Sequence, residues 1–353
     1  MRPIRNLTIV MGVLGVVVAL SQSPPQRTGP GVQAPQDAKY ADLIKTCKAP
    51  PPAGRGGGGG GKGGGKAPAA AAAPRDAKST EIPGVIAAGQ AWKEVWTVDG
   101  NNADGIIGTK DGGILIAQND NSKVVKLDKN GKVSDAYTGL NTSGSVAYNS
   151  KGALFVNNRG LNQSVGQLLP QSKPFLTKIN GDPLDCIGGV INDLTADSKG
   201  GVYFTMGGLY YGDAKANVTK YGENLTTNGI VLSADEKRLF VTNGTTVAVF
   251  DVRKDGSLTN QREFAKLEGG GAGDGSTFDT TGRLYVTTNP GIQVISPDGK
   301  YLGLIPTPRG VISVAFSGTD RKTLYAVSRD NAQNKDWIIA IKMLSQGPKG
   351  RGK

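Results

Sequence analysis

Residues 192–205, NDLTADSKGGVYFT, decide the fold that the sequence predicts. A polar residue begins a short apolar strand, an Asp-Ser-Lys-Gly turn follows, and a second strand begins after the turn. With Asn192 as position zero, Gly200 lies at position eight and Tyr203 at position eleven. We interpret this stretch as a β-hairpin that is led by a polar side chain.

The same pattern recurs along the chain. The other leading residues are Asp104, Gly144, Asn228, Asp274 and Ser313. Successive leaders are 36 to 48 residues apart. Repeats of about 40 to 50 residues built from short strands are typical of β-propeller blades, and no long helical periodicity competes with them. The sequence therefore predicts an all-β, six-bladed β-propeller over residues 81–345, closed by a strand at residues 91–98 that pairs with the last blade.

The chain changes character before the predicted propeller. Residues 1–21 combine a positive start, a fourteen-residue apolar run and small residues at its end, as a cleavable secretory signal does. We therefore expect a secreted or periplasmic protein with no transmembrane span in the mature chain; a membrane tether through residues 7–20 is the alternative. Residues 22–80, rich in Pro, Gly and Ala, are expected to form a disordered extension with one short helix near residues 37–46. Residues 346–353 form a basic tail.

The net charge of +12 lies mainly in the two ends of the chain. Residues 1–80 carry eleven basic and three acidic residues, whereas residues 81–345 carry twenty-seven and twenty-six. The Gly/Lys-rich stretch has no aromatic residues on which bases could stack. A specific nucleic-acid partner is therefore not expected.

The chain contains no histidine. This absence excludes Ser-His-Asp and Cys-His nucleophile systems, histidine zinc sites and imidazole proton shuttles. The two cysteines, Cys47 and Cys186, either form a disulfide in an exported chain or remain separate, and the sequence leaves both alternatives open.

The oxygen-bearing leaders form the candidate site. In a propeller the innermost strands line a central channel, so residues in equal register meet near one mouth of it. These leaders are Asp104, Asn192, Asn228 and Asp274. Two carboxylates and two amide oxygens suit a hard divalent cation, Ca²⁺ or alternatively Zn²⁺, Mn²⁺ or Mg²⁺. Local Asx turns are the competing interpretation of each leader, but their common register favours a metal site.

Four stretches in this order resemble the gluconolactonase/regucalcin (senescence marker protein) family. They are NDLTADSKGGVYFT (192–205), NGIVLSADEKRLFVTNG (228–244), DGSTFDTTGRLYVTTNPGIQVISPDGKYLGLIPTP (274–308) and VISVAFSGTDRKTLYAVS (311–328). The resemblance covers about residues 104–345. It implies a six-bladed propeller hydrolase with a divalent metal, usually Ca²⁺, in its channel. By motif, the family's metal ligands fall on the same four leaders, although the family's first ligand is usually Glu where this chain has Asp104.

The resemblance implies a small-molecule substrate, a sugar-acid lactone or related ester. The metal would polarise the carbonyl group, and Asp274 would activate the attacking water as general base. Asn192 would orient the substrate; Arg159 is a further candidate for substrate contact, with a solvated loop arginine as the competing interpretation. Asp193 is a candidate for holding the metal ligands in place, unless it only caps a turn. The alternative function is a non-catalytic exported propeller with a structural metal that binds a protein or a glycan.

Overall fold

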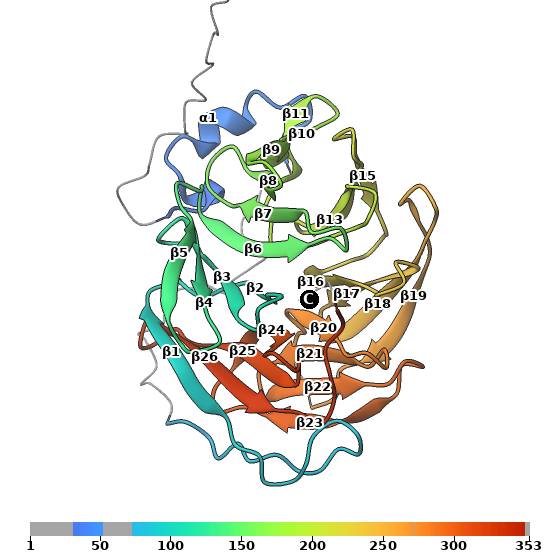
Figure 1. The fold of residues 1–353 in the computed structure, drawn as a ribbon. Helices are drawn as coiled ribbons and strands as arrows, with labels where there is room; N and C mark the ends of the chain where they lie inside the picture. The colour runs from blue at the N-terminus through green and yellow to red at the C-terminus, as the bar shows by residue number, and fades with distance from the viewer. Residues whose placement is uncertain (1–30, 52–72, 270, 350–353) are drawn as a thin grey trace, which may run out of the picture.

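A computed structural model describes residues 31–51, 73–269 and 271–349 of the chain. Six four-stranded antiparallel sheets form a ring of blades around a central axis (Figure 1). The nearly all-β, six-bladed propeller predicted from the repeats is confirmed. The expected signal segment, residues 1–21, lies outside the described residues.

The first three blades each consist of four strands that follow one another in the chain. Blade 1 contains β2 (Ile106–Gly108), β3 (Ile114–Gln118), β4 (Lys123–Leu127) and β5 (Val133–Tyr137). Blade 2 contains β6 (Ser143–Tyr148), β7 (Leu154–Asn158), β8 (Ser164–Leu169) and β9 (Lys173–Leu176). Blade 3 contains β12 (Leu194–Ala196), β13 (Val202–Thr205), β14 (Leu209–Gly212) and β15 (Val218–Tyr221).

The last three blades complete the ring. Blade 4 contains β16 (Thr227–Leu232), β17 (Arg238–Asn243), β18 (Thr246–Val252) and β19 (Leu258–Lys266). Blade 5 contains β20 (Ser276–Phe278), β21 (Leu284–Thr288), β22 (Gly291–Ile295) and β23 (Tyr301–Pro306). Blade 6 contains β24 (Val311–Ser317), β25 (Thr323–Asp330), β26 (Lys335–Lys342) and, from the other end of the propeller, β1 (Lys93–Asp99).

Strand β1 closes the ring. It pairs antiparallel with β26, from Lys93 opposite Ala340 to Asp99 opposite Lys335. This pairing covers the edge of β26 that would otherwise be open to another chain. The closure predicted for the strand at residues 91–98 is therefore confirmed.

The core is divided among the blades, because each sheet packs against a neighbouring blade on both faces: blade 1 contributes Ile106 to the cluster shared with blade 6 and Ile107 to the cluster shared with blade 2. Between blades 1 and 6, for example, Ile106 and Ile116 pack in one cluster with Val327 and Ile338, all fully buried. The turns that connect the strands stay at the surface, and Gly112, Gly152 and Gly200 occupy them with φ near +90°. The recurrent glycine of the sequence pattern is explained by this backbone conformation, which favours glycine.

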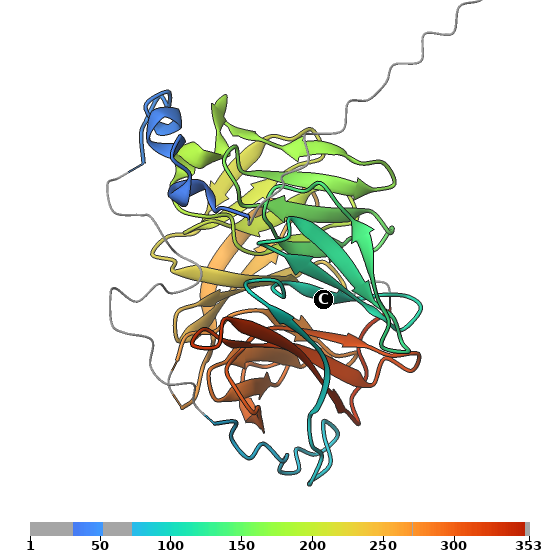
Figure 2. The ribbon, with the colours of Figure 1, turned by 90° about the vertical axis from the view of Figure 1, so that its left-hand side faces the viewer.

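Part of the expected extension packs on the propeller. Residues 31–51 contain the 3₁₀-helix η1 (Ala34–Gln36) and the helix α1 (Tyr40–Ile44), the latter inside the range where a short helix was expected. Figures 1 and 2 place α1 beside blade 2 and the hairpin β10 (Lys178–Ile179)–β11 (Asp182–Pro183). A disulfide joins Cys47 to Cys186 in the 3₁₀-helix η2 (Leu184–Ile187), with 5.7 Å between their Cα atoms. This bond and its neighbouring contacts are why residues 31–51 are ordered where a spacer was expected.

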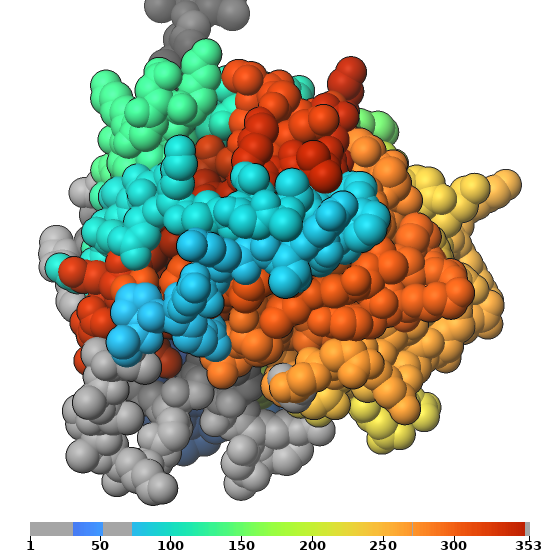
Figure 3. Space-filling view, turned by 90° about the horizontal axis from the view of Figure 1, so that it is seen from below, coloured from blue at the N-terminus to red at the C-terminus, as the bar shows by residue number. Residues whose placement is uncertain are grey.

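A second segment before the propeller crosses blades 5 and 6. Ile82, Val85 and Ile86 are buried in a cluster with Tyr285 and Trp337. Figure 3 shows this part of the chain, coloured blue to cyan, lying over the orange and red blades. Among the described residues, no helix has the length and apolar character that a membrane crossing requires.

Candidate active site at the channel mouth

The leaders have equal backbone register in three blades. The N–H groups of Asp104, Asn192 and Asp274 each donate to a carbonyl oxygen thirteen residues later, at 3.1, 2.8 and 2.9 Å respectively. The fourth leader, Asn228, lies at the start of β16, and the next residue, Gly229, touches Asp274: a Cβ atom on Gly229 would lie 2.2 Å from the Asp274 carbonyl oxygen. The sequence pattern thus places the four leaders around one end of the channel, and all four are partly buried there.

Three of the leaders are linked by hydrogen bonds through Arg159. One terminal nitrogen of Arg159 donates to Asp104 Oδ2 at 2.6 Å, and the other donates to Asn192 Oδ1 at 2.9 Å. Asn192 Nδ2 in turn donates to Asn228 Oδ1. An unbroken chain of hydrogen bonds therefore runs from Asp104 through Arg159 and Asn192 to Asn228.

Arg159 has no unused donor. Its Nε donates to the Ile191 carbonyl at 3.0 Å, and its terminal nitrogens also donate to Asn119 Oδ1 at 3.1 Å and to the Asn192 carbonyl at 2.7 Å. A guanidinium has five N–H groups, and these contacts use all of them. Arg159 is only 5% exposed, so the interpretation of this residue as a solvated loop arginine is wrong.

Asp193 ties three blades together directly behind the ring. Its Oδ1 accepts hydrogen bonds from Ser145 Oγ at 2.6 Å and from the Leu194 N–H at 2.8 Å. Its Oδ2 accepts from the Ile230 N–H in blade 4 at 3.1 Å. Asp193 therefore does more than cap a turn: it fixes the blade that carries Asn192 against the blade that carries Asn228.

The two carboxylates of the ring have opposite electrostatic environments. Burial alone would raise the pKa of Asp104, but the charges of Arg159 and Arg329 and the hydrogen bonds to Asp104 hold that pKa below its usual range. Burial, and then the charges of Asp104 and Asp193, raise the pKa of Asp274 to about 7. Within the described chain, the Asp274 carboxylate accepts no hydrogen bond that would counter this rise. The site therefore pairs one firmly ionised carboxylate with one that gains and loses a proton near neutral pH.

Asn119 and Arg329 were not identified from the sequence as neighbours of the ring, and Arg159 was named only as a candidate for substrate contact. Asn119 and Arg159 each lie fifteen residues after the leader of their blade, and Arg329 lies sixteen residues after Ser313, whose blade has one extra turn residue. Arg329 donates to Asp336 Oδ1 at 2.7 Å and to the Ala103 carbonyl at 2.9 Å, next to Asp104. Applying the register rule to this second position would have placed Asn119 and both arginines beside the ring.

The donor types suit calcium, but their arrangement does not. Two carboxylates and two amide oxygens are ligands that Ca²⁺ accepts. In this structure, however, Asp104 Oδ2 and Asn192 Oδ1 accept from a guanidinium, and Asn228 Oδ1 accepts from Asn192. Among the residues that the structure describes, no three His, Cys, Asp or Glu side chains form a group that could hold a metal. The four leaders as arranged therefore do not fit a cation held by all of them.

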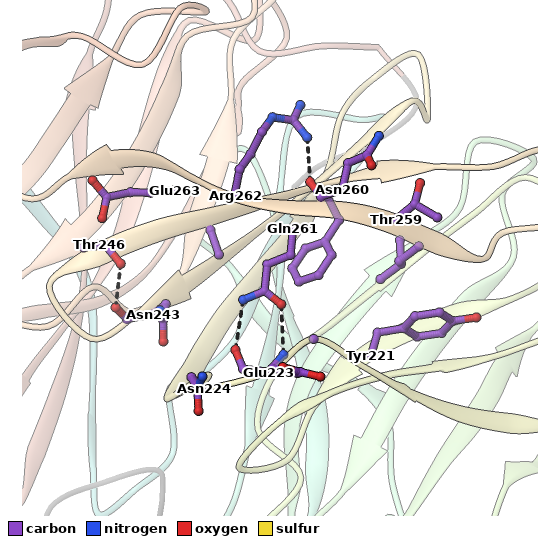
Figure 4. Close-up of a pocket in the computed structure, with 14 residues that line it drawn as sticks. Tyr221, Glu223, Asn224, Asn243, Thr246, Thr259, Asn260, Gln261, Arg262 and Glu263 are labelled. Carbon is purple, nitrogen blue, oxygen red and sulfur yellow. Dashed lines mark hydrogen bonds between the residues drawn. The ribbon is translucent and has the colours of Figure 1, made fainter.

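Two surface hollows lie away from the ring. One, of about 600 Å³, lies on blade 4, where Gln261 exchanges two hydrogen bonds with the Glu223 backbone (Figure 4). The other, of about 900 Å³, is lined by hairpin turns and includes Lys110, Tyr148 and Arg321. Neither hollow is lined by a leader, so the channel mouth is where the common register of the blades gathers polar groups.

Comparison with protein families supports the resemblance. Residues 176–330 match the family described as the SMP-30/Gluconolactonase/LRE-like region. Over these residues the chain is therefore similar to this family. The match includes three of the four leaders, Asn192, Asn228 and Asp274, so the predicted family resemblance is confirmed on the part of the chain that holds most of the ring.

Curated relatives of this gluconolactonase-like propeller include lactonases. Lactonase drp35 of Staphylococcus saprophyticus is 27% identical over 321 residues, which cover 78% of this chain and 92% of the relative. The gluconolactonase of Zymomonas mobilis is 33% identical over 116 residues, which cover 30% of this chain and 33% of the relative.

Solved structures share the fold at low sequence identity. A Xanthomonas campestris protein described as a gluconolactonase aligns with a TM-score of 0.61 and 18% identity, covering 78% of this chain and 96% of that one. A calcium-binding regucalcin of Agrobacterium tumefaciens aligns with a TM-score of 0.59 and 15% identity, covering 73% and 97%. At these identities the likeness concerns the fold alone.

Proposed function

We propose that the protein hydrolyses a lactone or a related ester of a sugar acid at the channel mouth. The similarity to lactonase drp35 over most of both chains supports the reaction class. The observation that carries the proposal is the ring itself, where an Asp274 carboxylate with a pKa near 7 and no hydrogen bond within the described chain lies on the blade next to Asn228, whose amide is oriented by Asn192.

Asp274 acts as the general base in this proposal. A base works best when its pKa is close to the working pH, because it is then ionised and still accepts a proton readily. Asp274 takes a proton from water as the water oxygen bonds to the substrate carbonyl carbon. When the carbon–oxygen bond of the ester breaks, the proton returns from Asp274 to the leaving oxygen, and the product is a hydroxy acid.

The charge of Asp104 helps to keep the pKa of Asp274 high, while the charges of Arg159 and Arg329 act on Asp274 in the opposite direction. Asp104 stays ionised because of Arg159 and Arg329. Asn192, fixed by Arg159, lies in the same ring and orients the substrate. No step of this mechanism passes through a metal ion, since the leaders as arranged do not fit one; calcium as a cofactor of this chain stays a prediction from the family resemblance.

We also propose that the protein is exported, to the periplasm or outside the cell. The disulfide between Cys47 and Cys186 supports this location, because disulfides persist in oxidising compartments. The apolar run near the start of the chain supports it as well.

The test is an initial-rate screen with γ- and δ-lactones of sugar acids and with simple esters. The wild-type protein should hydrolyse at least one of them, and Asp274→Asn should reduce kcat by about 10²- to 10⁴-fold, the usual contribution of a general base. Retained folding of the variant is checked by circular dichroism. Absence of turnover by the wild type on all of these substrates would favour the alternative, a non-catalytic propeller that binds a protein or a glycan.

A further inference from the structure

We propose that the hydrogen-bonded chain Arg159–Asn192–Asn228 supplies the positive charge and the oxyanion donor of this site in place of a divalent cation. The inference deepens the proposed lactone hydrolysis and rests on it for the role of Asn228. Its claim about metal ions stands on the geometry of the ring and is tested separately.

The orientation of both amides follows from Arg159. A guanidinium has no acceptor, so the atom of Asn192 that meets Arg159 at 2.9 Å must be its carbonyl oxygen. Asn192 Nδ2 must then be the atom that meets Asn228, and the atom of Asn228 that accepts must be its oxygen. The amide nitrogen of Asn228 is therefore left as the final donor of the chain.

This final donor lies on the blade next to that of the proposed base. Asn228 Nδ2 has no acceptor within the described part of the chain, and Asn228 is partly exposed. The backbone of Gly229 packs directly on that of Asp274, so the Asn228 amide and the Asp274 carboxylate belong to adjacent blades at one mouth. A substrate carbonyl oxygen that accepts from Asn228 Nδ2 would place its carbon near the water that Asp274 activates.

The charge of Arg159 strengthens that donor and disfavours an added cation. Each hydrogen bond in a chain polarises the next, so the buried guanidinium makes the Asn228 N–H groups better donors. The same fixed charge lies 2.6 Å from Asp104 Oδ2 and repels a second cation at the oxygens that it occupies. Arg159 is therefore a positioning residue, and Asn228 is the residue that touches the substrate.

The metal claim is tested by calcium titration of the wild type, Arg159→Met and the control Arg283→Met. Arg283 also forms a partly buried ion pair, with Asp279 at 2.7 Å, but it lies at a hairpin turn. After chelator treatment and buffer exchange, calorimetry and the calcium-induced shift in Tm are measured. We expect no saturable binding below about 1 mM calcium in the wild type or in Arg283→Met, and saturable binding in Arg159→Met, because the oxygens of Asp104 and Asn192 then no longer face a guanidinium.

One bound calcium per wild-type chain in this range would overturn the metal claim, whether or not the protein hydrolyses any substrate. Failure of Arg159→Met to gain affinity, when it is folded, would also contradict it. The wild-type titration needs no variant to fold, so the claim can be tested even if Arg159→Met does not fold.

The donor claim is tested by the kinetics of Asn228→Asp in the presence of chelator. Asp has the same shape and keeps an acceptor for Asn192, but it has no N–H donor at this position. We expect kcat to fall about 10²- to 10³-fold with little change in KM, as for the loss of one oxyanion donor. Asn243→Asp is the control, because Asn243 uses only its oxygen, towards the Thr226 N–H at 2.7 Å, and should retain wild-type kcat. An unchanged kcat in Asn228→Asp, with an active wild type, would overturn the donor claim.

Discussion

Two sets of Asp and Asn side chains repeat with the blades, and they differ in where they find their partners. Five residues after the leader, Asp197, Asp279 and Asn149 each accept two backbone N–H groups of their own hairpin turn, at 2.8 to 3.0 Å. The leaders Asp104, Asn192 and Asn228 instead bind side chains from other blades or later strands, and Asp274 binds none within the described chain.

This difference in partners separates the residues that stabilise the fold from those that form the candidate active site. An Asx turn satisfies its carboxylate or amide locally and holds the hairpin, so its effect is on stability. A leader without a local partner is held by distant groups instead, and within the described chain the Asp274 carboxylate and Asn228 Nδ2 are left without a partner at the channel mouth. The Asx turns of these hairpins are therefore formed by the residues at position five, and the leaders Asp104, Asn192 and Asn228, for which Asx turns were the competing interpretation, bind other side chains instead.

The largest contrast is expected between Asp274→Asn and Asp279→Asn. The pKa of Asp274 is raised in the folded state, so its contribution to stability is fully present below the unfolded pKa near 4 and is lost as the pH rises through about 7. Asn carries no charge, so Asp274→Asn should be more stable than the wild type at pH 8 by about 4 kcal/mol, although it is inactive.

Asp279→Asn should do the opposite. It removes the ion pair with Arg283 and perturbs the hydrogen bond from the Tyr285 hydroxyl, at 3.0 Å, and should lower the free energy of unfolding while leaving kcat unchanged. Urea unfolding at pH 8 measures both variants. If Asp274→Asn is less stable than the wild type at pH 8, ionisation of Asp274 in the folded protein does not cost the free energy that its raised pKa implies.

The next effect is expected at a fully buried turn residue. Asp197 accepts the N–H groups of Lys199 and Gly201 at 2.8 Å and the Tyr211 hydroxyl at 2.8 Å. Asp197→Ala leaves these donors unsatisfied and should cost about 2 to 4 kcal/mol of unfolding free energy. Chemical denaturation measures this loss, and kcat per folded molecule should stay at the wild-type value. A loss of kcat without a loss of stability would show that a turn residue also contributes to catalysis.

The smallest effect is expected at a surface turn whose backbone N–H groups are bound by a single carboxylate oxygen. Asp213 lies in the turn after β14, and its Oδ1 accepts the Lys215 and Asn217 N–H groups at 2.8 and 2.9 Å. Asp213→Asn keeps that oxygen and loses only the exposed hydrogen bond that Oδ2 accepts from Asn217 Nδ2 at 2.9 Å, so its Tm in a thermal melt should correspond to a stability change below about 0.5 kcal/mol. A larger change would mean that the negative charge of the carboxylate, and not the acceptor oxygen alone, stabilises such turns.

The blades and the ring were predictable because register is periodic. Leaders at equal positions of six similar hairpins had to lie at equal depth, and closure through β1 followed from the need to cover the edge of β26. The role of Arg159 was not predictable from its own position, because register does not say which of several polar neighbours a long side chain will reach. The pairing of Cys47 with Cys186, 139 residues apart, depended on how residues 31–51 pack, and low-complexity sequence around them gave no sign of it.

The most direct test of the account is the pH dependence of kcat/KM for lactone hydrolysis by the wild type, measured in the presence of chelator. Because the free enzyme needs ionised Asp274, the account predicts that kcat/KM rises with pH through an apparent pKa of about 7 and then levels off. A profile that is already level at pH 5, or activity that disappears with the chelator, would contradict it.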